Sequence, residues 1–141
     1  MPHIQIVQAA PLEQLAERFE PLSARHGETV IKTTAIYLNA RDRTALVQAL
    51  VVEPRVHRKF YVLLVEKPGA MMVRLDPLTD PEKTDAVKRA LAMVADWVRR
   101  ISPESRYGTT NLSEFLLDGA RESANGPTPP PAGSDPADSV D

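Results

Sequence analysis

The chain has 141 residues, of which 43% are hydrophobic and 26% charged, and its formal net charge is −2. These proportions are typical of a globular domain with a single core and exclude a fibrous or wholly disordered chain. Because the sequence contains no cysteine, disulfides, cysteine-based zinc sites, iron–sulfur clusters and thiol nucleophiles are excluded as well.

The first part of the chain predicts a short strand followed by an amphipathic helix. Residues 3–7 alternate weakly between polar and apolar side chains, which indicates a possible extra strand at the N-terminus. Pro11 suits the first turn of a helix, and four apolar residues recur at helical spacing over 12–19. Pro21 should end or kink this helix, and Gly27 closes the segment.

The middle of the chain is strand-like, with four runs rich in Val, Ile, Thr, Tyr and Leu. We place the strands at residues 29–38, 44–52, 60–66 and 71–75. The connections between them are short enough for hairpins of antiparallel strands. The expected sheet is therefore a four-stranded antiparallel meander.

A long helix is predicted after the sheet. Thr79 and Glu82 have the spacing of a capping box, and Pro81 is favoured near a helix start. One apolar stripe then runs to Ile101, with Trp97 as its packing anchor. The stripe consists of Val87, Ala90, Leu91, Val94, Trp97, Val98 and Ile101. This helix should lie on one face of the sheet.

A short terminal helix is predicted over residues 112–117, capped by Asn111 with Glu114 three residues later. Its apolar side chains, Leu112, Phe115 and Leu116, are candidate interface residues. The complete expectation is an α+β domain over residues 1–118, built from the meander, an N-terminal helix, the long C-terminal helix and this terminal helix.

The C-terminal residues 119–141 predict a disordered tail. After Gly119 the chain contains five prolines, several Ser, Gly and Asp residues and almost no large apolar side chains. Such a segment cannot bury enough surface to offset the entropy lost on ordering.

Nothing in the sequence predicts export or insertion into a membrane. The first fifteen residues contain no basic segment leading into an apolar stretch, and no run of about 18 apolar residues occurs anywhere. We therefore expect a cytoplasmic protein.

Two of the predicted strands are apolar on both faces. Gln48 is the one polar residue in 45–52, and 61–65 contains no charged residue. A half-solvated antiparallel strand would alternate, so both faces of these strands should be covered. The long helix covers one face, and the N-terminal helix, the Phe115 helix or a second copy of the chain covers the other. Homodimerisation is the leading expectation about partners.

The sequence contains no motif for catalysis, a metal or a cofactor. His3, His26 and His57 are scattered and form no metal-ligand pattern, and the six glycines stand singly rather than in a phosphate-binding loop. We expect no catalytic residue and no bound cofactor.

A basic connection before Phe60 is the candidate binding site. Basic side chains beside aromatic ones suit phosphate contact and base stacking, although long basic side chains at hairpin ends are usually only solvated. Phe60 and Tyr61 should point to opposite faces of their strand. The candidate residues are Arg55, His57, Arg58 and Lys59.

Three functions remain open from the sequence. The first is a non-catalytic protein–protein interaction module, acting as an adaptor or chaperone. The second is binding of nucleic acid or another anionic ligand through the basic connection. The third is a small-ligand or enzymatic pocket between the sheet and the terminal helix.

Overall fold

The computed structural model describes residues 1–116 of the chain. They form one antiparallel sheet of seven strands in the order β2-β3-β4-β5-β6-β1-β7. Its strands are β1 (His3–Val7), β2 (Leu22–His26), β3 (Thr29–Asn39), β4 (Thr44–Val52), β5 (His57–Lys67), β6 (Ala70–Leu75) and β7 (Arg106–Thr110). The helical elements are α1 (Leu12–Glu17), α2 (Asp85–Ile101) and the single 3-10 turn η1 (Ser113–Phe115).

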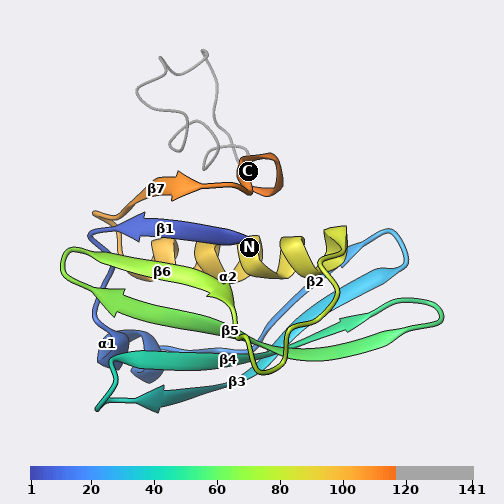
Figure 1. The fold of residues 1–141 in the computed structure, drawn as a ribbon, viewed down its shortest axis with the longest axis horizontal. Helices are drawn as coiled ribbons and strands as arrows, with labels where there is room; N and C mark the ends of the chain where they lie inside the picture. Colours follow the sequence, from blue (N-terminus) through green and yellow to red (C-terminus); the bar gives the residue numbers. More distant parts are fainter. Residues whose placement is uncertain (117–141) are drawn as a thin grey trace.

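The sheet curls into a half-barrel around α2, which lies behind it in Figure 1. The helix contacts strands from both halves of the sheet, namely β1, β6, β3 and β4. Side chains alternate along the strands, so every second residue of β4 is buried in the core beneath α2. We call the side of the sheet that points away from α2 the outer face.

The helix α2 is held by its cap and by its apolar stripe. The hydroxyl Oγ1 of Thr84 accepts a hydrogen bond from the backbone N–H of Val87 at 3.3 Å, so the helix begins after Thr84 and not near Thr79. Most of the predicted stripe is buried against the sheet. The Trp97 ring meets the ring of Phe19 edge-on at a centroid distance of 5.6 Å, which ties the end of α1 to α2.

The strands from the two ends of the described chain, β1 and β7, pair with each other at one side of the sheet. β1 lies between β6 and β7, and side chains reinforce its pairing with β7. The Gln5 oxygen Oε1 accepts a hydrogen bond from the Thr109 backbone N–H at 3.1 Å. A Cβ at Gly108 would lie 2.3 Å from that same oxygen, so glycine leaves room for the Gln5 side chain against β7.

The predicted four-stranded meander with a long C-terminal helix is wrong, because the sheet has seven strands. The four predicted strands coincide with β3, β4, β5 and β6 to within a few residues. The possible extra strand is β1, which lies inside the sheet. The sequence interpretation missed β2, which follows the proline expected to end or kink the first helix, and β7, which lies between the two predicted C-terminal helices.

The prediction of a terminal helix over 112–117 is also wrong. Within the described residues this segment contains only the turn η1, whose N-terminal flanking residue Leu112 makes no side-chain cap. The predicted tail over 119–141 and its boundary near Gly119 lie outside the described residues.

The double cover expected for β4 and β5 is found on one face only. Both α1 and α2 lie on the inner side of the sheet, where Leu12 and Leu15 join the core. On the outer face the side chains of β4 are only partly buried, and no helix within residues 1–116 lies over them. The expected cover by a second copy is not tested by the structure, which contains one chain.

Candidate functional site

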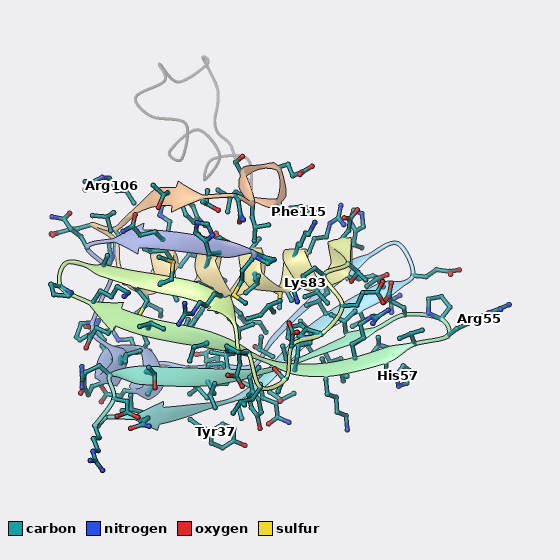
Figure 2. The ribbon with its side chains drawn as sticks, in the orientation of Figure 1. Tyr37, Arg55, His57, Lys83, Arg106 and Phe115 are labelled. Carbon is teal, nitrogen blue, oxygen red and sulfur yellow. The ribbon has the colours of Figure 1, made fainter. Side chains whose placement is uncertain are left out.

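The predicted basic connection is divided between two faces of β5. Arg55 is exposed at the end of the β4–β5 hairpin, where Figure 2 shows it projecting away from the rest of the domain. His57 and Lys59 are exposed on the outer face. Arg58 lies on the inner side between them, so the four residues do not form one patch.

Arg58 is occupied by ion pairs. Its guanidinium lies 3.6 Å from the carboxylate of Glu53 and 3.3 Å from that of Glu82, each measured from nitrogen to oxygen. The residue is therefore a connector between the hairpin and the segment before α2. It is not placed to contact a ligand on the outer face.

The three predicted interface residues have different positions. Leu112 and Leu116 are buried in the core of the chain. Phe115 is partly buried, and the cationic groups of Lys88 and Arg89 lie 5.8 and 5.5 Å from the centre of its ring. Of the three side chains, only Phe115 reaches the surface.

The outer face is ordered by the pairing registers, which set outward side chains of neighbouring strands opposite one another. Successive rows are two residues apart along each strand, or about 6.6 Å. Starting at the β2–β3 end, the rows are Arg25, Val30, Val52 and His57; Ser23, Lys32, Leu50 and Lys59; Ala35, Gln48 and Tyr61; Tyr37, Leu46, Leu63, Arg74 and His3; Asn39, Thr44, Val65, Met72 and Gln5; Lys67, Ala70, Val7 and Arg106.

Among the strand residues, those that point to the outer face carry positive charge and no negative charge. Among the seven strands described, Glu66 is the only acidic residue, and it lies on the inner side, where it bonds to Leu12 and Arg43. Six of the seven Lys and Arg residues in the strands point outward. They are Arg25, Lys32, Lys59, Lys67, Arg74 and Arg106.

These six cations, the outer-face cations, have no ionic partner within residues 1–116. The cations that do form ion pairs are Arg43, Arg58, Lys83 and Arg100, and all four lie off the outer face. The Nε atom of Arg74 is buried and has no hydrogen-bond partner in this part of the chain. The outer face therefore presents uncompensated donors and an uncompensated positive field.

Two tyrosines stand in the middle of this face. The rings of Tyr37 and Tyr61 meet edge-on, with their centres 6.3 Å apart. The Tyr37 hydroxyl donates a hydrogen bond to Oε1 of Gln48 at 3.3 Å. Tyr37 is nevertheless 53% exposed, and Figure 2 shows it projecting away from β3.

A cleft of about 410 Å³ lies at one end of the half-barrel, beside Arg43, Glu66 and the β5–β6 turn. The Arg43 guanidinium bridges two carboxylates, with its Nη1 2.5 Å from Glu13 and its Nε 2.6 Å from Glu66. The hydrogen bond from Arg43 lowers the pKa of the Glu13 carboxyl from its ordinary 4.5 to about 2. Because these charges satisfy one another, they tie α1 to the sheet.

The three histidines lie on three separate strands, β1, β2 and β5. Among residues 1–116 no three His, Cys, Asp or Glu side chains are placed to hold a metal ion. In the same part of the chain, neither helix has the length and apolar character required to cross a bilayer.

Sequence reasoning missed the outer face as a site, although a signal for it was present. Every Lys or Arg within the predicted strands shares the outward parity of its strand, but that parity becomes a surface only when the strand order is known. Comparison with protein-family models, with curated proteins and with solved structures finds no match for the chain, so its function must be inferred from the geometry of this surface.

Proposed function

We propose that this chain is a non-catalytic binding protein that binds an anionic partner on the outer face of its sheet. One observation carries the proposal: the six outer-face cations have no ionic partner within the described residues, and no acidic residue of the seven strands points to their face.

The separation of charge supports this function. Lys and Arg side chains on the surface of a neutral protein are normally interspersed with Asp and Glu, which limits self-repulsion. Here the described acidic residues lie in turns, in helices, beside the helices or at the inner position of Glu66. A one-sided positive field attracts anions and speeds their association.

The same charges favour a different molecule over a second copy on this face. Two copies packed outer face to outer face would bring like charges together, which costs free energy wherever the charges are desolvated. The apolar residues between the cations, such as Leu46 and Leu63, are partly buried by their neighbours and can add apolar contact to an anionic partner.

Retention on immobilised heparin, a sulfated polysaccharide, tests the proposal. The whole chain has a net charge of −2, so retention at about 50 mM salt requires a local positive patch. The face variant replaces three exposed outer-face lysines by serine, Lys32→Ser, Lys59→Ser and Lys67→Ser. We expect it to elute at clearly lower salt than the unchanged protein.

A matched control variant distinguishes an effect of the outer-face lysines on heparin retention from an effect of net charge. Arg18→Ser, Lys83→Ser and Arg100→Ser remove three exposed cations that lie away from the outer face. This control variant has the same net charge as the face variant and should elute like the unchanged protein. Equal shifts for the two variants, or no retention of the unchanged protein, would contradict the proposal.

A further inference from the structure

We infer that the anionic partner is single-stranded nucleic acid and that a base stacks on Tyr37. This inference rests on the proposed function and adds the chemical class of the partner. The observation behind it is the position of an exposed, laterally fixed aromatic ring among unpaired cations.

Tyr37 has the properties of a stacking platform. Its ring is held at the side by the edge contact with Tyr61 and at the hydroxyl by Gln48, so little side-chain entropy remains to be lost on binding. It still exposes 53% of its surface. Stacking on an aromatic side chain accepts any base, because every base has a π-face.

Cations stand on both sides of the tyrosine pair. Lys32 and Lys59 face each other across Leu50 in the row next to that of Tyr61. Arg74 lies in the row of Tyr37, on the far side of Leu46 and Leu63. By the row spacing of about 6.6 Å, Lys32 and Lys59 lie about 13 Å from the row of Tyr37, and by the strand spacing of about 4.8 Å Arg74 lies about 14 Å from Tyr37. A strand of several nucleotides spans these distances, so one base can lie on the ring while neighbouring phosphates meet the cations.

The aromatic pair distinguishes single strands from other anions. In a duplex the bases are stacked on one another, and the phosphates alone would meet this face, which leaves Tyr37 unused. An acidic peptide or an anionic lipid surface would also engage the lysines, but neither supplies a planar ring to stack on Tyr37. Single-stranded nucleic acid uses both the cations and the ring.

Fluorescence anisotropy with a labelled strand of about ten thymidines tests the inference, since one such strand spans a typical single-strand site. The variant Tyr37→Leu keeps an apolar side chain but removes the π-face, and Tyr37→Phe keeps the ring. We expect Tyr37→Leu to weaken binding at least about fivefold and Tyr37→Phe to bind like the unchanged protein.

The salt dependence separates stacking from charge. Replacing Lys32 and Lys59 by serine should reduce the slope of log K against log salt by about 1.4, which corresponds to two phosphate contacts on a single strand. Tyr37→Leu should leave that slope unchanged. Because all three residues are exposed, each variant should melt at the temperature of the unchanged protein. The melting temperature therefore checks that the fold is intact.

Two results would overturn the inference. One is unchanged thymidine binding by Tyr37→Leu, and the other is tighter binding to a duplex of equal length, to poly-glutamate or to phosphatidylserine vesicles. In either case the proposed function would still stand if heparin retention depended on the outer-face lysines. Loss of that dependence would refute both.

Discussion

Arg43 combines an unusual backbone conformation with two ion pairs. It has a positive φ of 56° in the β3–β4 turn, a conformation that few residues other than glycine adopt without cost. Its carbonyl oxygen accepts a hydrogen bond from Glu66 N at 3.0 Å, and its guanidinium bridges Glu13 and Glu66. The surrounding contacts therefore hold Arg43 in a strained backbone geometry.

The Glu13–Arg43 pair predicts a specific dependence of stability on pH. The pKa of Glu13 is about 2 in the folded protein and 4.5 ordinarily. A lowered pKa means that the ionised carboxylate stabilises the folded state above pH 4.5, and that this stabilisation is lost as the pH falls toward 2. We expect the melting temperature of the unchanged protein to fall more between pH 5 and pH 2 than that of Glu13→Gln.

The comparison of the two melting curves isolates this carboxyl from the other acidic groups, which titrate in both proteins. Parallel curves over this pH range would mean that the ion pair is fully screened by solvent.

Some residue positions could be predicted from the sequence. Phe60 and Tyr61 were expected on opposite faces, and Phe60 is buried while Tyr61 lies on the outer face, which confirms the prediction. Lys59 was interpreted as part of a loop, whereas it belongs to β5. That one assignment hid the relation between Lys59 and Tyr61, which share a face two residues apart.

Among the elements, the buried strands could be predicted from the sequence and the edge strands could not. The strands β3, β4, β5 and β6 contain long β-branched or apolar runs and were found. The edge strand β2 is exposed along most of its length, so it has no apolar alternation. The other edge strand, β7, is short and contains Gly108, and glycine weakens any strand signal.

The terminal segment gives an element-scale prediction. Leu116 is 2% exposed, whereas Phe115 is only partly buried. We expect Leu116→Ala to lower the free energy of unfolding by about 2–5 kcal/mol, the range for a buried leucine. Phe115→Ala should cost less, about 1–2 kcal/mol, because part of its ring stays in contact with water.

Urea denaturation of the two variants measures both values. A larger loss for Phe115→Ala than for Leu116→Ala would mean that Phe115, and not Leu116, anchors this segment to the core.

At the scale of the whole molecule, the domain has an apolar concave side filled by helices and a cationic convex side. The sequence indicated that β4 and β5 were apolar on both faces, but it could not say that the outer face also carried most of the strand cations. That required the order of all seven strands, because Arg25, Arg74 and Arg106 belong to strands distant in the chain.

This arrangement predicts the association state. We expect sedimentation at low salt to give a monomer, because two outer faces whose strand residues carry only positive charge repel one another. The face variant, with Lys32, Lys59 and Lys67 replaced by serine, should associate more readily than the unchanged protein. A dimer that tightens at low salt and dissociates in the face variant would contradict the prediction and assign the outer face to self-association.

The place of β1 inside the sheet has a consequence for the order of folding. The hairpins from β2 to β6 join neighbours in the chain, so each can pair as soon as it has been synthesised. By contrast, β1 pairs with strands that are distant in the chain, because Ile4 lies opposite Val73 on one side and opposite Thr110 on the other. The strand β1 is therefore among the last to be paired. Its pairing with β6 and β7 closes the longest loops in the sheet, so it carries the largest entropic cost in the assembly of the sheet.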